Sequence, residues 1–168
     1  MSFSIYQVTV PQLLHMLTNF SSILKKAAAY AEAKKIDPAI FINARLAPDM
    51  FSLDKQVQIV SDTAKGCVAR LADIEIPRFE DNEKTFDELQ ERITNTVQFI
   101  ESVPAEKMAG SENRTIQLKF PHKTFEFDGV TYLTSFVFPN FYFHLTTAYD
   151  ILRHNRVELG KQDFLGGA

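Results

Sequence analysis

Four segments of the chain repeat their apolar residues at alternating steps of three and four, and this periodicity constrains the fold more than any other feature. Because an α-helix has 3.6 residues per turn, such steps collect the apolar side chains on one face of a helix. The four segments span residues 10–35, 53–73, 86–103 and 131–154. Four amphipathic helices of this kind predict an all-α, antiparallel four-helix bundle around one shared core.

Residues at the ends of the first three segments are typical of helix boundaries. Pro11 suits a first helical turn, where its missing N–H costs no hydrogen bond, and Pro38 ends the first helix because the residue before a proline avoids the α conformation. Ser52 is a good N-cap for the second helix, and Thr85 with Glu88 matches a capping box for the third. The boundaries therefore agree with the periodicity.

The fourth segment is unusual because its aromatic side chains point in nearly every direction around the predicted helix. They are Phe136, Phe138, Phe141, Tyr142, Phe143 and Tyr149. Pro139 either opens this helix or kinks it, and we favour a kink because a helix over 131–154 matches the first helix in length. A helix that is apolar all round must be covered all round. A second copy of the chain would supply part of that cover, so we expect a homodimer.

The periodicity changes once, between the third and fourth helices. Residues 115–120 and 125–127 alternate apolar and polar side chains, residues 121–124 resemble a turn, and Asp128-Gly129 is a turn signal. This pattern predicts a small β-hairpin inserted into the bundle. A lone hairpin is marginal in water, so we expect its apolar face to lie on the helices.

Two further segments lie outside the predicted helices and the hairpin. The connection of residues 36–52 is longer than bundle loops usually are, and connections of that length often carry function or a short helix of their own. It gives the predicted bundle a long crossover between its first and second helices. The glycine-containing tail of residues 157–168 is expected to lead away from the fourth helix.

Length and composition are those of a single globular domain. With 168 residues, 45% of them hydrophobic and 23% charged, the chain is expected to form one domain over residues 1–168. Its 18 basic and 21 acidic residues give a formal charge of −3, which argues against nucleic acid or an anionic membrane as a partner.

The sequence shows neither a membrane-spanning apolar stretch nor a signal-peptide pattern, so we expect a cytoplasmic protein. The single Cys67 is expected to be a packed thiol.

The sequence contains no common catalytic or phosphate-binding motif. Among single residues, His144 is the candidate for a functional side chain because of its position on the fourth helix. On the fourth helix it shares a face with Phe141 and Ala148, so its imidazole points inward. An inward imidazole needs a polar partner.

Several polar side chains are candidates for a pocket around His144. Gln56 of the second helix and Asp49 of the long connection are possible partners, whereas Asp62 lies on the other flank and also suits an exposed ion pair with Lys65. The candidate pocket comprises His144, Gln56, Asp49, Asp62 and Tyr149. His144 is then a hydrogen-bonded core residue, a metal ligand, or a group that binds an organic ligand or transfers a proton.

Three segments of the sequence resemble a known family. They are ARLAPDMFSLDKQVQ, PNFYFHLTTAYDILRHN and LGKQDFLG, and the resemblance covers almost the whole chain. The family is a domain of unknown function similar to the DinB/YfiT-like superfamily of proposed metalloenzymes. The resemblance implies a four-helix bundle with a long first crossover, and the superfamily includes metal-dependent thiol transferases that use mycothiol, bacillithiol or glutathione-like cosubstrates.

The usual metal site of that superfamily takes one histidine from the second helix and an HxxxH pair from the last long helix. Here His144 matches the first histidine of the pair, Ala148 stands at the second position, and residues 53–71 contain no histidine. Two of the three expected imidazoles are absent, so we expect no bound metal. His144 is the only candidate ligand retained, and zinc or nickel would be the metal.

Three functions follow from these observations. The first is a small-ligand-binding relative that has lost the three-histidine metal site. The second is a divergent metal- or thiol-dependent transferase or hydrolase, in which His144 acts as a base or joins an unconventional site with Gln56, Asp49 or Asp62. The third is a structural dimeric module.

Overall fold

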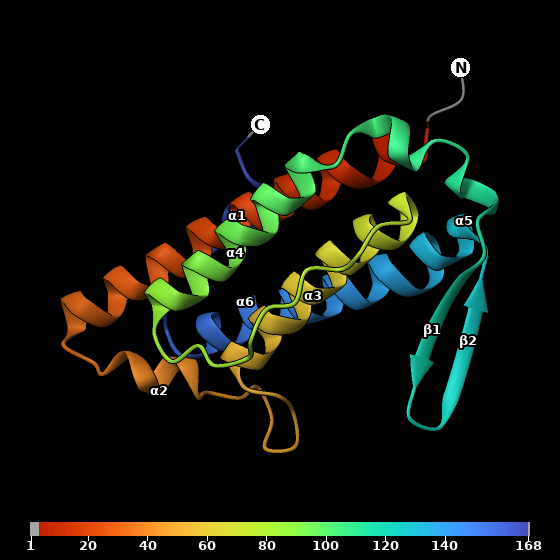
Figure 1. Cartoon of the computed structure of the whole chain (residues 1–168). Coiled ribbons are helices and arrows are strands. Elements are labelled where there is room, and N and C mark those ends of the chain that lie inside the picture. The colour runs from red at the N-terminus through yellow and green to blue at the C-terminus, as the bar shows by residue number, and fades with distance from the viewer. Residues whose placement is uncertain (1–3, 168) are drawn as a thin grey trace.

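The computed structural model describes residues 4–167. Four long helices, α1 (Ile5–Lys34), α3 (Leu53–Ala72), α4 (Phe86–Ser102) and α6 (Phe138–His154), form a bundle (Figure 1). The connections contain shorter elements: α2 (Pro38–Ile42), the 3-10 turns η1 (Ala105–Met108) and η2 (Ser111–Asn113), the strands β1 (Ile116–Phe120) and β2 (Lys123–Phe127), α5 (Gly129–Thr131), the π-helical turn η3 (Tyr132–Val137) and α7 (Lys161–Leu165). The predicted all-α four-helix bundle with an inserted hairpin is confirmed.

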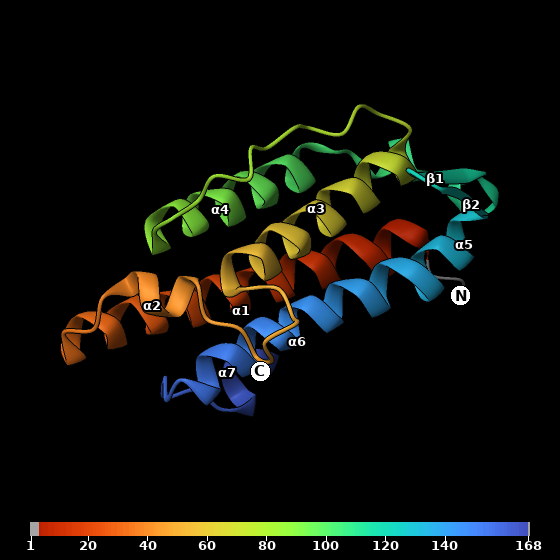
Figure 2. The same ribbon diagram turned by 90° about the horizontal axis from the view of Figure 1, so that it is seen from below.

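The connection after α3 determines the topology of the bundle. Residues 73–85, here called the returning segment, run back along the helices before α4 begins, so α3 and α4 point in the same direction (Figures 1 and 2). α1 and α6 point the opposite way, so the predicted antiparallel arrangement holds for α3 with α1 and with α6 but is wrong for α3 with α4, because the returning segment carries the chain back before α4 begins. The connection of residues 36–52 carries the short helix α2, as expected, whereas nothing in the apolar pattern predicted the course of the returning segment. α3 packs against both α4 and α6, so it has a neighbour on two sides.

The core is formed by the apolar faces of the long helices. Phe20, Val60 and Phe141 are fully buried in it, and so is Cys67. The prediction of a packed thiol is therefore confirmed, and burial raises the pKa of Cys67. Among the described residues, no helix is long and apolar enough to cross a membrane.

α1 begins five residues earlier than predicted. Ser4 and Gln7 form a capping box, in which the Gln7 N–H donates to Ser4 Oγ (3.2 Å) and the Ser4 N–H donates to Gln7 Oε1 (3.0 Å). Pro11 therefore lies inside the helix and not in its first turn, which corrects the prediction. Pro11 cannot bond the carbonyl of Gln7, four residues before it, but Gln7 is exposed and water can satisfy that carbonyl. By contrast, the capping box predicted for Thr85 and Glu88 is present at the start of α4.

The fourth predicted helix is continuous but irregular. Helical backbone runs from Gly129 through α5 and the π-helical turn η3 into α6. Pro139 is the second residue of α6, two positions after the last residue of the π-helical turn. A π-helical turn widens the helix, here just before the position where proline removes a hydrogen bond. The proline therefore modifies the long helix without ending it.

The hairpin covers the aromatic helix only at its base. β1 and β2 pair antiparallel, with Ile116 opposite Phe127, and only residues 121 and 122 form the turn. The Phe127 ring packs against Tyr132 and Phe136, with centroid separations of 6.3 and 6.2 Å. Towards the tip, the apolar face extends beyond this contact. The expectation that the hairpin lies on the bundle therefore holds for its base and not for its tip.

The C-terminal tail folds back onto the bundle, contrary to the expectation that it leads away. α7 packs against α1, where His15 Nε2 lies 2.7 Å from the Leu165 carbonyl oxygen. Lys26 and Asp163 form an ion pair of 2.6 Å at the same junction. The tail contributes one apolar ring, Phe164, which packs edge-on to a tyrosine of α6, and this apolar contact with the polar ones explains why the tail docks.

Candidate functional site

His144 lies where α6 packs against α3, and it is half-buried. Its Nδ1 atom is 2.6 Å from Oε1 of Gln56, a side chain of α3 that is only 1% exposed. The Nε2 amide group of Gln56 donates to the carbonyl oxygen of Phe51 at 3.1 Å. Because the amide nitrogen is used for Phe51, the amide oxygen is left to accept from His144, so Nδ1 carries the proton.

This hydrogen-bond chain leaves the lone pair of the neutral imidazole on Nε2. Burial lowers the pKa of His144, which keeps the ring neutral at pH 7. Within the described residues, Nε2 of His144 makes no hydrogen bond. A neutral imidazole with one nitrogen held and the other unpaired can accept a hydrogen bond or take up a proton.

One exposed aromatic side chain lies beside the imidazole. The ring of Phe143 stands edge-on to His144 with a centroid separation of 5.2 Å, and Phe143 is 56% exposed. Phe51, whose carbonyl holds Gln56, is also exposed. An exposed apolar ring therefore adjoins the imidazole.

Of the five candidate pocket residues, the structure joins His144 and Gln56. The predicted contact between His144 and a polar side chain of the second long helix is thus present. Asp49 is an exposed residue of the connection before α3. Tyr149 is directed to the tail, where its ring packs against Phe164 at 5.9 Å.

Asp62, the fifth candidate, belongs to a different cluster of polar side chains. It forms the expected ion pair with Lys65 (3.0 Å), and its carboxylate also lies 2.8 Å from Arg92 of α4. These contacts are on the α4 side of α3, whereas His144 is on the α6 side. Asp62 is therefore engaged away from the imidazole.

The residues near His144 do not fit a three-histidine metal site. Ala148, one turn further along α6, is fully buried and offers no donor atom, and residues 53–71 of α3 contain no histidine. No group of three or more His, Cys, Asp or Glu side chains that could hold a metal ion occurs within residues 4–167. A first-row transition metal needs several convergent donors, and one imidazole is too weak a set.

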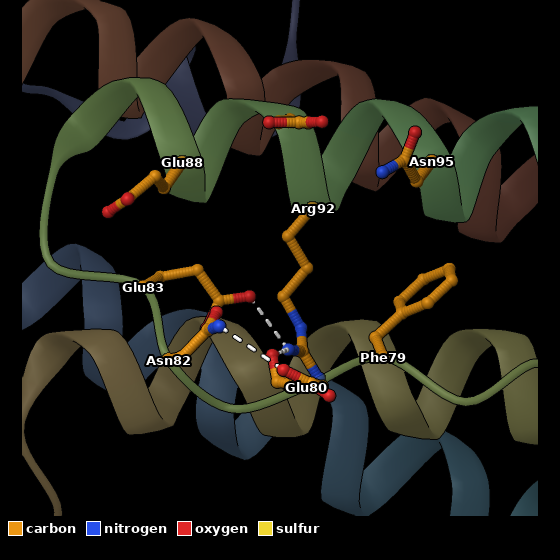
Figure 3. A pocket seen from close by; sticks show the side chains of 8 residues that line it. Phe79, Glu80, Asn82, Glu83, Glu88, Arg92 and Asn95 are labelled. Atoms are coloured by element: carbon orange, nitrogen blue, oxygen red, sulfur yellow. Dashed lines mark hydrogen bonds and ion pairs between the residues drawn. The ribbon is translucent and has the colours of Figure 1, made fainter.

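The α4 side of α3 carries a second polar region, centred on Arg92, which the sequence analysis did not predict. Arg92 is 3% exposed, and its guanidinium forms ion pairs with Glu83 (2.8 Å), Asp62 (2.8 Å) and Asp81 (3.1 Å). It also donates to the carbonyl of Glu80 at 3.1 Å. Figure 3 shows Arg92 extending from α4 to the returning segment. The ion pairs therefore fix that segment across α3 and α4.

Further contacts hold the same segment. Lys65 donates to the Pro77 carbonyl at 2.8 Å, and its ammonium lies 4.8 Å from the centre of the Phe79 ring. Lys55 pairs with Asp81. Although burial acts in the opposite direction, the hydrogen bond and charge of Lys55, together with Arg92, lower the pKa of Asp81.

A cavity of about 310 Å³ adjoins Arg92 (Figure 3). Its lining combines acidic and amide side chains with one ring: Phe79, Glu80, Asn82, Glu83, Glu88, Glu91, Arg92 and Asn95. Glu83 and Glu88 are already used, Glu83 by Arg92 and Glu88 by the capping box of α4. Arg92 Nε has no hydrogen-bond partner within the described residues. The carboxylates of Asp62, Asp81 and Glu83 more than balance the charge of Arg92. These four side chains form a structural ion-pair cluster, here called the clasp.

One sequence signal pointed to the clasp. Arg92 follows Leu89 by three residues and precedes Thr96 by four, so it falls on the buried side of α4. A charged residue at such a position requires a buried partner. The partner could not be located from periodicity, because Glu83 lies in an irregular segment.

The chain was compared with family models, solved structures and curated proteins. Residues 5–165 match the family described as "Domain of unknown function (DUF1993)". The chain is also similar to the crystal structure of a DinB family member protein from Shewanella denitrificans, with 43% sequence identity and a TM-score of 0.89 over 98% of this chain and 93% of that one. No curated protein matches.

Proposed function

Because the chain belongs to the DUF1993 family, a group of unknown function, we propose its function from the site itself: it is a DinB-like protein that binds a small molecule at His144. The observation that carries this proposal is the chain of hydrogen bonds from His144 through Gln56 to Phe51. That chain fixes the imidazole and leaves Nε2 unpaired at the surface. No side chain among the described residues engages Nε2, so this acceptor is available to a ligand that carries a donor group.

The geometry favours one chemical class of ligand. Nε2 of the neutral ring is an acceptor, so the ligand must bring an O–H, N–H or S–H group. The exposed ring of Phe143 beside the imidazole favours an aromatic or aliphatic body next to that donor. Phenols and small thiols combine both properties.

In this proposal the protein has lost the three-histidine metal site of the DinB/YfiT-like superfamily. Ala148 supplies no ligand at one position, and α3 supplies no histidine at the other. The amide of Gln56 is a positioning group for His144, and the remaining imidazole serves a metal-free site.

A second candidate function rests on the same imidazole. A neutral histidine whose Nδ1 proton is held by a side chain is arranged like a general base, so a transferase or hydrolase that removes a proton from a thiol or hydroxyl is the alternative. This alternative predicts turnover of a thiol substrate, whereas the binding proposal predicts saturable binding without turnover.

The test is an NMR titration of the histidine ring signals with phenol and with glutathione as probes. We expect saturable shifts of the His144 ring signals and of the Phe143 backbone amide with at least one probe, and loss of the Phe143 response in the His144→Asn variant. His154→Asn is the matched control, because His154 lies exposed at the end of the same helix. Metal analysis of protein purified without an affinity tag is the second measurement, and we expect substoichiometric zinc and nickel.

Two results would contradict the proposal. If neither probe moves the His144 signals more than those of His154, the imidazole is not a binding group for this ligand class. If zinc or nickel is bound in one-to-one ratio and is lost in His144→Asn, the metal site is retained and the transferase alternative is supported.

A further inference from the structure

β2 carries an unpaired backbone edge on the outside of the molecule. Within the described residues the sheet has two strands, so only one edge of β2 is paired with β1. In Figure 1, β1 lies between β2 and the helices, and the free edge of β2 faces away from the bundle. Residues 123–126 are all exposed. A free edge of this kind is a template for another strand.

The register of the hairpin shows which backbone groups face the free edge. Pairs in an antiparallel ladder alternate between hydrogen-bonded and non-hydrogen-bonded, and the pair that flanks a two-residue turn is hydrogen-bonded. Phe120 and Lys123 flank the turn, and Leu118 is opposite Phe125. The backbone groups of Thr124 and Glu126 therefore point outward.

The charges along the hairpin are arranged for pairing with an identical strand. Lys119, His122 and Lys123 lie at the tip, whereas Glu126 and Asp128 lie at the base. In an antiparallel pair of identical hairpins, the tip of one lies beside the base of the other. The basic end then meets the acidic end twice, once on each side of the two-fold axis.

We propose that two copies of this chain associate through antiparallel pairing of β2 with β2, with Phe125 opposite the partner's Phe125. This register places Thr124 opposite the partner's Glu126, and these are the residues whose backbone groups point outward. Phe125 then forms a non-hydrogen-bonded pair, in which the side chains approach most closely. The result is a four-stranded antiparallel sheet with the order β1-β2-β2-β1.

Side chains on both faces suit this register. On one face, Lys119 is opposite Thr124, which is small enough for the lysine to reach the partner's Glu126 across it. On the other face, Lys123 comes opposite the partner's Phe127, and its ammonium already lies 4.4 Å from the centre of the Phe125 ring in one copy. Charge and aromatic contacts therefore form at both ends of the strand.

The pairing also covers the exposed tip. Phe120 and Phe125 are 49% and 37% exposed, and their rings lie edge to face with centroids 5.8 Å apart. A second hairpin laid along β2 removes part of this apolar surface from water. An anionic membrane is a poorer occupant, because Glu126 and Asp128 would be repelled by it.

The experiment is sedimentation equilibrium of the full chain up to about 1 mM, since an interface of two short strands is small and its affinity correspondingly weak. We expect the mean mass to rise with concentration from 19.1 kDa towards twice that value. Thr124→Pro removes an outward N–H and spares the ladder with β1, so it should abolish the rise. Thr124→Val keeps that N–H and is the matched control, with association unchanged.

A charge exchange tests the register independently of proline. Lys119→Glu places like charges together across the interface and should weaken association at least several-fold, and adding Glu126→Lys to the same chain should restore it. A mass that stays at one chain throughout overturns the proposal, as does association that survives Thr124→Pro. Binding of monomeric protein to vesicles of phosphatidylserine and phosphatidylcholine, lost in Lys119→Glu without any self-association, also overturns it and assigns the tip to a membrane.

Discussion

The two sides of α3 carry polar side chains of different kinds. On the α4 side, Arg92 is surrounded by carboxylates, and the charges hold the returning segment in place. On the α6 side, Gln56 holds one nitrogen of His144 and leaves the other unpaired. The first region has more charges and a cavity, yet apart from Arg92 Nε the groups of the cluster bind one another. We therefore place the proposed binding site on the α6 side, where the accessible acceptor of His144 is not engaged by another side chain.

The largest effect is expected from removing the centre of the clasp. Arg92→Met leaves the buried carboxylate of Glu83 without its cation and frees the returning segment. Loss of one partner of a buried pair typically costs about 3 kcal/mol or more in the free energy of unfolding. Urea denaturation measures this cost.

The control for that variant is Arg153→Met, at the exposed end of α6, where we expect a change within about 0.5 kcal/mol. The response of His144 to probes should be preserved in folded Arg92→Met. If Arg92→Met is as stable as the control, the clasp is not what fixes the returning segment. If Arg92→Met is stable but its His144 signals no longer respond to the probes, the two sides of α3 are coupled and do not act independently.

A smaller effect is expected when single carboxylates of the clasp are neutralised. The side chain of Glu83 is 8% exposed and that of Asp81 is 39% exposed, although both pair with Arg92. Buried charges depend on their partners more than exposed ones. We expect Glu83→Gln to lower the free energy of unfolding by about 1 to 2 kcal/mol and Asp81→Asn by less than about 1 kcal/mol. Equal losses of unfolding free energy, measured by the same denaturation, would show that the burial of a carboxylate does not determine how much its ion pair with Arg92 stabilises the protein.

Periodicity predicted the parts of the molecule in which helices supply the residues. His144 and Gln56 both lie on regular helices, so their directions follow from residue number, and their contact was predicted. The clasp was not predicted, because Glu83 and Asp81 come from an irregular segment whose course no repeat describes. The start of α1 was misplaced for a local reason. Pro11 suggested a first turn, and the capping box of Ser4 and Gln7 in fact begins the helix earlier.

The smallest expected effect is the pH dependence that His144 adds to stability. Burial lowers the pKa of His144 in the folded protein, whereas in the unfolded chain it is about 6.5. Between these two values the unfolded chain binds more protons, so stability rises with pH across that window. The contribution is complete above about pH 6.5, declines as the pH falls, and is lost below the folded pKa. It should be small, because the ring is only half-buried.

Comparison of wild type with His144→Asn by urea denaturation between about pH 5 and pH 7.5 isolates this contribution, because other groups titrate in both proteins. The pKa of Asp81 is lowered in the folded state by Lys55 and Arg92, against the effect of burial, so its contribution is lost only at more acidic pH. We expect wild type to lose more stability than His144→Asn as the pH falls from 7 to 5. Parallel curves would show that the imidazole is as accessible to protons as in the unfolded chain. A probe bound at Nε2 should steepen the wild-type curve, because protonation of that nitrogen and acceptance of a hydrogen bond exclude each other.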